Sequence, residues 1–207
     1  MNRILSSVAL AFICLFPVYG QMAWNAKYQN YFNQYKDLAI EQMLKYRIPA
    51  SITLAQGVFE SGAGYSDLAR NGNNHFGIKC HGWQGRKTYH DDDARNECFR
   101  AYDSPGQSYE DHSKFLVQSQ RYRRLFSLKI TDYKGWAHGL KACGYATNPA
   151  YAKKLIDIIE LYKLHKYDSA HGYDKFMAKH ASEESPALNG GTLHPIKMYN
   201  KNYYIIA

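Results

Sequence analysis

Long apolar segments, runs of basic residues and metal-binding motifs are missing from most of this chain. Beyond residue 20, no segment approaches the about twenty consecutive apolar residues that cross a bilayer. The chain has no run of five or more basic residues and no zinc-finger or RNA-binding signature, so we expect no nucleic-acid partner. Its histidines show neither His-Glu-x-x-His nor another zinc spacing, which argues against a zinc amidase. We therefore expect neither a metal nor a cofactor.

Cysteine is also scarce, and the first of the four cysteines lies in a distinct N-terminal segment. This segment opens with Arg3, continues with apolar residues from Ile4 to Val18 and ends at the small residue Gly20. A basic start, an apolar stretch and a small residue at the cleavage point are typical of a signal peptide. We interpret residues 1–20 in this way and expect an exported protein, periplasmic or secreted, without a stable membrane anchor. Uncleaved attachment to the membrane interface is the alternative.

Three cysteines follow the predicted signal peptide, at Cys80, Cys98 and Cys143. An odd number in an oxidising compartment indicates one disulfide and one free thiol. Cys80 and Cys98 flank a candidate hairpin and are the predicted pair. Cys143 stands near the end of a predicted helix, and we interpret it as a small core residue.

Acidic residues are outnumbered, with 18 Asp and Glu against 26 Lys and Arg, and the formal net charge is +8. Loss of Arg3 with the signal peptide lowers this charge by one, to +7. An exported basic domain is expected to meet an anionic partner, and a negatively charged cell envelope fits better than nucleic acid. The alternative is that the charge only keeps the protein soluble. We expect the protein to be a monomer.

Two successive helices are predicted in the first part of the chain. From Ala26 to Tyr46, aromatic and aliphatic residues recur at helical spacing, which predicts one long amphipathic helix. Pro49 is expected to begin a second helix, since proline suits the first helical turn. That helix ends at Glu60, where apolar neighbours disfavour the charged carboxylate and raise its pKa. Glu60 is therefore a candidate general acid. The alternative is an ordinary carboxylate at a helix end.

A β-rich region follows a short helix at Ser66–Arg70 and a turn at Asn71–Asn74. Segments rich in strand-forming residues alternate there with turn-forming ones, which predicts a small twisted sheet or a pair of hairpins. The segments are residues 76–80, 87–90 and 97–102.

Helices are predicted again after this region. Ser104-Pro105-Gly106-Gln107 supplies an N-cap, a proline at the first helical position and a capping-box glutamine. Thr131 is expected to cap a further helix, and Asn148-Pro149 another. The expected division of the chain is a packed domain at 21–167, a polar linker at 168–193 and a strand-like tail at 194–207.

Four sequence blocks, taken in order, are more specific than any one of them alone. They are Pro49-Ala50-Ser51-Ile52-Thr53-Leu54-Ala55-Gln56 with Glu60-Ser61-Gly62, then Asn73-Asn74-His75-Phe76-Gly77-Ile78-Lys79, then Phe99-Arg100-Ala101-Tyr102-Asp103-Ser104, and finally Gly144-Tyr145-Ala146-Thr147-Asn148-Pro149 with Tyr151-Ala152. In this order and spacing the chain resembles glycoside hydrolase family 73, the peptidoglycan N-acetylglucosaminidases. Their domain is often labelled mannosyl-glycoprotein endo-β-N-acetylglucosaminidase-like. The resemblance covers residues 36–164.

The resemblance implies an α+β, lysozyme-like fold in which a glycan-binding cleft lies between a mainly helical lobe and a small β-hairpin lobe. It implies hydrolysis of the β-1,4 bond after N-acetylglucosamine in peptidoglycan or a related glycan, with Glu60 as the general acid. Tyr145 resembles the tyrosine that lines the cleft near the reacting sugar. Residues His194 to Ala207 resemble the lead-in to a LysM glycan-binding module, and the sequence contains no such module.

Glycoside hydrolysis usually needs a second carboxylate as base or nucleophile. The family typically has a glutamate on the first strand of the hairpin, whereas this chain has Asp91 and Asp92 after that strand, so the match fails in residue type. Asp91 and Asp92 are equally favoured, and Glu97 is a further candidate. Alternatively the acetamido group of the substrate acts as the nucleophile, and an acidic residue or Tyr145 orients that group or the water.

Several other residues are candidates for binding sugar. Their aromatic members can stack on sugar faces, although each is equally compatible with the core. Their polar members lie in or near turns, and they either face the cleft or fix the turn. The candidates are Asn74, His75, Phe76, Trp83, Tyr102 and Asn148.

Three other interpretations compete with a glycosidase. Cys143 as nucleophile with His138 or another histidine as base would make a cysteine amidase or peptidase acting on stem peptides and sensitive to thiol reagents. A non-catalytic envelope protein on the same fold would bind glycans without producing new reducing ends. The aspartate run at residues 91–93 offers oxygen ligands for calcium, but it lacks the spacing and the glycine of an EF-hand loop.

Overall fold

The computed structural model describes residues 22–92, 94–170, 193–198 and 201–206. The fold is mainly helical with two small antiparallel sheets, so the predicted α+β class is confirmed. The expected signal peptide and residues 171–192 of the expected linker lie outside the described residues. Among the helices that the structure describes, none is long and apolar enough to cross a membrane.

The first two helices are those predicted from the sequence. Helix α1 spans Ala26–Tyr46, and the Asn25 side chain caps it by accepting a hydrogen bond from the Lys27 N–H at 2.8 Å. Helix α2 spans Ala50–Glu60. Pro49 directly precedes α2, in keeping with its fixed φ and missing N–H.

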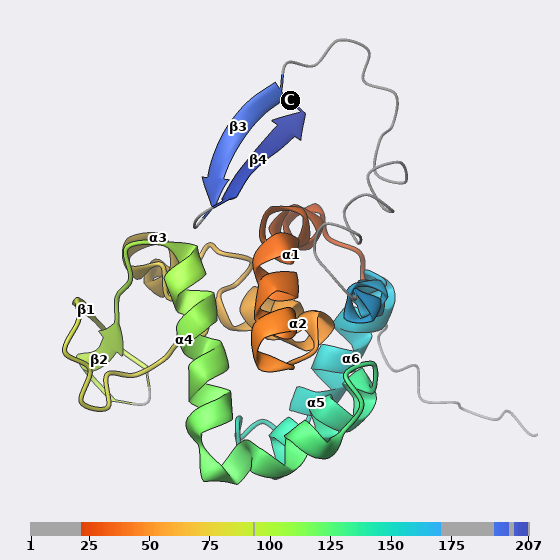
Figure 1. The fold of residues 1–207 in the computed structure, drawn as a ribbon. Helices are drawn as coiled ribbons and strands as arrows, with labels where there is room; N and C mark the ends of the chain where they lie inside the picture. The colour runs from red at the N-terminus through yellow and green to blue at the C-terminus, as the bar shows by residue number, and fades with distance from the viewer. Residues whose placement is uncertain (1–21, 93, 171–192, 199–200, 207) are drawn as a thin grey trace, which may run out of the picture.

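Helix α2 lies at the centre of the helical lobe (Figure 1). Every side chain from Ala50 to Val58 is buried. The surrounding elements that contact α2 are α1, α5 (Tyr133–Ala142), α6 (Tyr151–Leu161) and the 3₁₀ helix η2 (Leu164–Ser169). Most of these buried residues are apolar, as expected for a helix surrounded by others, and the polar Ser51, Thr53 and Gln56 are buried with them. Only its carboxyl end, at Glu60, presents an exposed side chain.

The amino end of α2 receives its side-chain cap from a distant part of the chain. Pro49 provides none, and the Asp168 carboxylate instead accepts hydrogen bonds from the Ser51 N–H at 2.9 Å and the Ser51 hydroxyl at 2.6 Å. Burial raises the pKa of Asp168 to about 7, although the hydrogen bonds from Ser51 act to lower that pKa. Asp168 and Ala170 are both buried, so the packed domain extends past residue 167 and the linker does not begin at 168.

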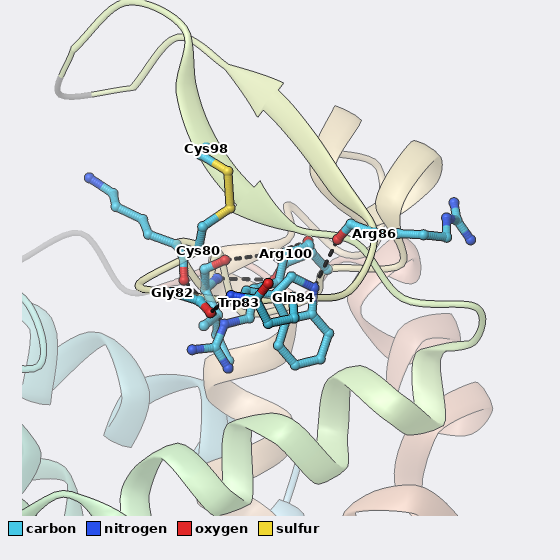
Figure 2. The surroundings of a disulfide bond; sticks show 10 residues. Cys80, Gly82, Trp83, Gln84, Arg86, Cys98 and Arg100 are labelled. Carbon is cyan, nitrogen blue, oxygen red and sulfur yellow. Dashed lines mark hydrogen bonds between the residues drawn. A yellow bond between two sulfur atoms is a disulfide. The ribbon is translucent and has the colours of Figure 1, made fainter.

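The β-lobe contains one hairpin. Strand β1 (Lys87–His90) pairs antiparallel with β2 (Glu97–Arg100) in a register that places Tyr89 opposite Cys98. A disulfide joins the predicted partners, Cys80 and Cys98 (Figure 2). Because the bond links positions 18 residues apart, it removes loop-closure entropy of the unfolded chain that is worth about 3 kcal/mol. It ties the segment before β1 to β2.

The predicted strand at residues 76–80 is wrong, since the segment forms only an isolated bridge between Lys79 and Phe99. The Asn74 side chain explains the difference. It accepts a hydrogen bond from the Ile78 N–H at 3.1 Å and donates one to the Ile78 carbonyl at 3.0 Å. The segment still bonds to β2, since the Arg100 N–H donates to the Ile78 carbonyl at 3.0 Å and the Cys80 N–H donates to the Cys98 carbonyl at 2.9 Å, but the turn bonds at Ile78 keep it from extending as a regular strand.

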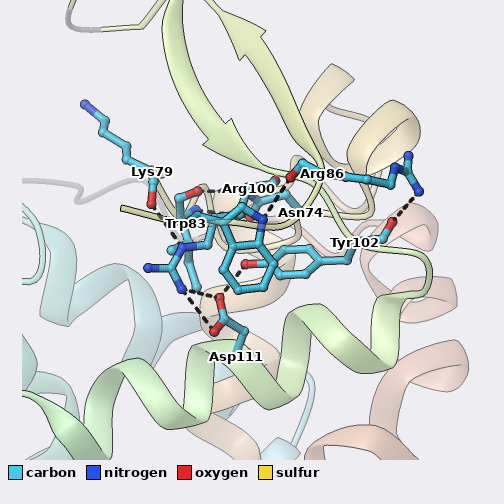
Figure 3. A network of polar contacts seen from close by, with 8 residues as sticks. Asn74, Lys79, Trp83, Arg86, Arg100, Tyr102 and Asp111 are labelled. Carbon is cyan, nitrogen blue, oxygen red and sulfur yellow. Dashed lines mark hydrogen bonds and ion pairs between the residues drawn. The ribbon is translucent and has the colours of Figure 1, made fainter. Parts of the chain in front are cut away.

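A polar network fixes the β-lobe to α4 (Pro105–Gln118), as Figure 3 shows. Arg100, at the end of β2, donates two hydrogen bonds to the Asp111 carboxylate at 3.1 and 2.8 Å. The Tyr102 hydroxyl donates to the same carboxylate at 2.6 Å. The Arg100 guanidinium also lies 5.0 Å from the centre of the Trp83 ring. The side chains of Arg100 and Asp111 are each only 16% exposed, so solvent screens this ion pair less than it screens a surface pair.

The later helix starts agree in part with prediction. Ser104 caps α4 as expected, by accepting from the Gln107 N–H. The expected cap of α5, Thr131, is wrong. The Asp132 carboxylate caps α5 by accepting from the Gly135 N–H at 2.9 Å, and a carboxylate is the stronger acceptor. The remaining described elements are α3 (Asp67–Gly72), the 3₁₀ helix η1 (Gln120–Ser127) and the antiparallel strands β3 (Leu193–Met198) and β4 (Lys201–Ile206) in the tail.

Gly57 on α2 gives a test of how tightly this helix is packed. A Cβ at Gly57 would lie 2.5 Å from the Tyr31 hydroxyl and 3.1 Å from the Tyr109 hydroxyl. We expect Gly57→Ala to cost about 1–3 kcal/mol of overpacking, offset by about 1 kcal/mol of helix propensity. Denaturant unfolding should show a net loss of stability. Gly106→Ala is the control, because a Cβ there meets nothing closer than 3.7 Å. Equal stability of the two variants would contradict the tight packing.

Candidate active site

Glu60 ends α2 at a tightly bonded turn. The Ser61 hydroxyl donates to the Gly57 carbonyl at 2.5 Å and accepts from the Gly64 N–H at 2.8 Å. Residues 62–64 all have positive φ, at 55°, 61° and 83°, a conformation that glycine adopts freely. The chain therefore leaves α2 through Ser61 into a left-handed turn, and the Glu60 side chain is exposed.

The environment of Glu60 gives its carboxyl group an unusual affinity for a proton. Although part of the side chain is exposed, loss of hydration around the carboxyl group raises its pKa to about 7. A hydrogen bond with Tyr151 lowers this pKa, and the charge of Asp92 raises it. The Tyr151 hydroxyl accepts a hydrogen bond from the Gln56 amide at 3.0 Å. Near neutral pH, Glu60 therefore exists in both protonated and charged forms.

Tyr145 lies beside Tyr151 at this site. The two rings are stacked with their centres 5.7 Å apart, and the Tyr145 and His112 rings meet in a T-shaped arrangement with their centres 6.2 Å apart. Burial raises the pKa of the Tyr145 hydroxyl well above its usual value, with the charge of Glu60 as a further cause. Burial also lowers the pKa of His112 to about 3. Both side chains are therefore neutral at neutral pH.

The three candidate carboxylates of the hairpin differ in their surroundings. Asp92 is the one whose charge acts on the carboxyl group of α2, and its Oδ2 lies 3.6 Å from the Lys79 ammonium. Asp91 accepts a hydrogen bond from the Asn96 N–H at 2.7 Å, within its own loop. Both oxygens of Glu97 accept from Lys79 at 3.0 Å. Asp92 is therefore the hairpin carboxylate with an electrostatic link to α2.

Four of the predicted sugar-binding residues are buried, with exposed fractions of 5% or less. They are Asn74, His75, Phe76 and Tyr102. His75 Nδ1 lies 3.0 Å from the Tyr31 hydroxyl, and burial lowers the pKa of His75 to about 4. Phe76 stacks on His112 with the ring centres 3.9 Å apart. These contacts give the four residues structural roles, and their burial leaves little surface for a sugar.

Trp83 and Asn148 remain at the surface. Trp83 is half-buried, and its indole N–H donates to the Arg86 carbonyl at 2.9 Å (Figure 2). Asn148 is exposed, and its side chain accepts from the Ala150 N–H at 2.9 Å, just before α6 begins. Asn148 therefore shapes the start of α6, whereas Trp83 keeps part of its ring available for a ligand.

Two residues of the site, Gln56 and Tyr151, were missed by sequence reasoning. Gln56 stands four positions before Glu60, a spacing that places both on one helix face, so a signal was available. Tyr151 belongs to the fourth sequence block, but its bond with Gln56 joins residues 95 positions apart. Local sequence patterns carry no information on such a contact.

The rival chemistries find less support in the arrangement of side chains. Across the described ranges, no group of three or more His, Cys, Asp or Glu side chains could hold a metal ion. The Cys143 sulfur accepts a hydrogen bond from Arg124 Nε at 3.2 Å, and His138 is exposed. No hydrogen bond among the described residues joins Cys143 to His138, so the structure does not present them as a nucleophile and its base.

The two neighbours of Glu60 should shift its pKa in opposite directions. Asp92→Asn removes a negative charge, so the pKa of Glu60 should fall. Tyr151→Phe removes a donor to the carboxylate, so the pKa should rise. NMR titration of the Glu60 side-chain carboxyl carbon measures both shifts. Asp103→Asn is the control, because Asp103 is paired with Arg86 at 2.7 Å and should leave the titration unchanged. Shifts of the same sign in the first two variants would contradict this arrangement.

The chain is similar to several known proteins over most of its packed domain. The family model described as mannosyl-glycoprotein endo-beta-N-acetylglucosaminidase, the glucosaminidase family, matches residues 36–164. The exo-glucosaminidase LytG of Bacillus subtilis is 33% identical over 156 residues, which cover 70% of this chain and 55% of LytG. The peptidoglycan hydrolase FlgJ of Vibrio parahaemolyticus is 29% identical over 142 residues, which cover 63% of this chain and 46% of FlgJ. The chain thus spans about half the length of these relatives.

The fold also matches a solved structure. The catalytic domain of the autolysin Auto from Listeria monocytogenes superposes with a TM-score of 0.57 at 27% sequence identity. The match covers 72% of this chain and 91% of that domain. The helical lobe and the small hairpin lobe therefore have the arrangement of an autolysin catalytic domain, and the expected lysozyme-like fold is confirmed.

Proposed function

Since the chain belongs to the glucosaminidase family, glycoside hydrolase family 73, we propose that it hydrolyses the β-1,4 bond after N-acetylglucosamine in peptidoglycan strands. The observation that supports this best is the carboxyl group of Glu60, whose pKa is raised to about 7 at an exposed helix end. A carboxyl group with this pKa has a proton to give near neutral pH. The excess of basic over acidic residues suits an anionic cell wall.

In the proposed reaction, Glu60 gives its proton to the glycosidic oxygen as the bond between that oxygen and the anomeric carbon breaks. Glu60 then becomes a carboxylate, which the hydrogen bond with Tyr151 stabilises. A water molecule then adds its oxygen to the anomeric carbon. Its released proton goes to a carboxylate of the site, so that Glu60 can be protonated again. Tyr145, which lies beside Tyr151, positions the N-acetyl group of the reacting sugar.

We assign the second carboxylate role to Asp92 before Asp91. The charge of Asp92 acts on Glu60, whereas Asp91 is bonded to the backbone of its own loop. Glu97 is paired with Lys79 through both oxygens and comes last. Asp92 acts as base or nucleophile, or it orients the acetamido group of the substrate if that group is the nucleophile.

The position of the cut in the glycan strand and the location of the protein are also part of the proposed function. We propose cleavage inside the glycan strand, by an exported monomer in the periplasm or outside the cell. LytG is named an exo-glucosaminidase, so cleavage from a strand end is the alternative within the same chemistry. Trp83 is the surface aromatic residue that we retain as a sugar-binding candidate.

Replacement of Glu60 by Gln tests the acid directly. Gln keeps the shape of the side chain but has no proton to donate, so Glu60→Gln should lower the rate by roughly 100- to 10,000-fold. Purified peptidoglycan is digested with the mature protein and with the variant, and the borohydride-reduced products are identified by mass spectrometry. We expect reduced N-acetylglucosamine ends with the wild-type protein alone. Large internal fragments early in the digest would indicate cleavage within strands.

Glu160→Gln is the matched control, because Glu160 lies on the exposed face of α6 and is paired with Lys134. This variant should cleave like the wild-type protein. Near-normal cleavage by Glu60→Gln would contradict the assignment of the acid. Reduced muramic acid ends would instead make the protein a muramidase, and cut stem peptides would make it an amidase or a peptidase. Binding without cleavage by the wild-type protein would favour a non-catalytic glycan-binding role.

A further inference from the structure

An exposed aromatic ring stands on the turn that follows Glu60. Tyr65 is 60% exposed. Its N–H donates to the Gly62 carbonyl at 3.3 Å, and the next N–H, of Ser66, donates to the Ser61 carbonyl at 2.9 Å. These bonds fix the backbone of Tyr65 relative to the end of α2. The same turn therefore carries both the proposed acid and an aromatic ring that faces solvent.

Helix α1 packs against this turn through Lys27 and Tyr31, which lie on one face of the helix. A side chain at Gly64 would lie 3.5 Å from the Tyr31 ring, so α1 packs closely against the backbone of the turn. Lys27 stands four residues before Tyr31, on the same helix face. Its ammonium lies 5.0 Å from the centre of the Tyr65 ring. Lys27 is also exposed, so the positive charge and the ring form one accessible pair.

This pair has the chemistry to bind a sugar that carries an acidic peptide. An exposed aromatic face can stack on the C–H groups of a pyranose ring, and an ammonium can bind a carboxylate. Peptidoglycan presents both groups side by side, as glycan rings with carboxylate-bearing stem peptides. On the basis of the proposed function, we propose that Tyr65 and Lys27 form a subsite for a stem-bearing sugar next to the bond that is cut.

A second cation–aromatic pair lies immediately before Glu60, but it is less suited to this role. Lys154 is 5.0 Å from the centre of the Phe59 ring. That ring is half-buried and packs against Tyr151, with their centres 6.1 Å apart. Phe59 therefore belongs to the packing of the site, whereas Tyr65 offers its ring to a ligand.

The test separates the ring from the charge by using two substrates. One is intact peptidoglycan, and the other is the same glycan with its stem peptides removed. Tyr65→Ala should weaken binding and raise KM about 2- to 10-fold on both substrates. Tyr65→Phe keeps the ring and should behave like the wild-type protein. Lys27→Ala should weaken binding about 2- to 5-fold on intact peptidoglycan alone, and added salt should remove that difference.

Binding is measured in the Glu60→Gln background, so that it does not depend on cleavage. Lys129→Ala, which removes an exposed lysine between η1 and α5, controls for loss of overall charge. If the wild-type protein cleaves the glycan but Tyr65→Ala leaves binding and KM unchanged, the subsite is wrong and the proposed function stands. If the wild-type protein does not cleave but Tyr65→Ala still weakens binding, the hydrolase is wrong and Tyr65 stands only as part of a glycan-binding site. An equal effect of Lys27→Ala on both substrates would overturn the assignment to acidic stems.

Discussion

The burial of α2 is the constraint on which the candidate site depends. Because its side chains are buried from Ala50 to Val58, a shift of α2 would open cavities or overpack its neighbours, and either change costs on the order of 1–5 kcal/mol per large side chain. Asp168 caps one end of the helix, and the left-handed turn at residues 62–64 ends the other. Glu60 is thus held in place by packing that serves the whole fold.

Two opposing effects on the pKa of Glu60 link the packing of α2 to the proposed chemistry. Loss of hydration favours the protonated form of Glu60, and the hydrogen bond with Tyr151 favours the charged form. An acid that only retained its proton would be a poor catalyst, because it must release that proton as the bond breaks. In the proposed reaction, Tyr151 would stabilise the carboxylate that remains on Glu60 after proton transfer.

Sequence patterns predicted the elements that depend on local chemistry. Helical periodicity and Pro49 predicted α1, α2 and the position of Glu60 at the end of a helix. Patterns failed where a distant residue decides the outcome. Asp168 caps α2 from 117 positions away, and Tyr151 meets Gln56 across 95 positions. The family resemblance supplied the site chemistry, but it could not tell which polar residues are buried.

A crystal structure of Glu60→Gln with an N-acetylglucosamine oligosaccharide longer than two sugars would test the proposed role of α2 most directly. We expect the side-chain amide of residue 60 to lie about 2.6–3.2 Å from a glycosidic oxygen. We also expect Asp92 to lie near the anomeric carbon of the same bond. A glycan bound with all its glycosidic oxygens far from the carboxyl end of α2 would contradict the proposal that this helix presents the catalytic acid.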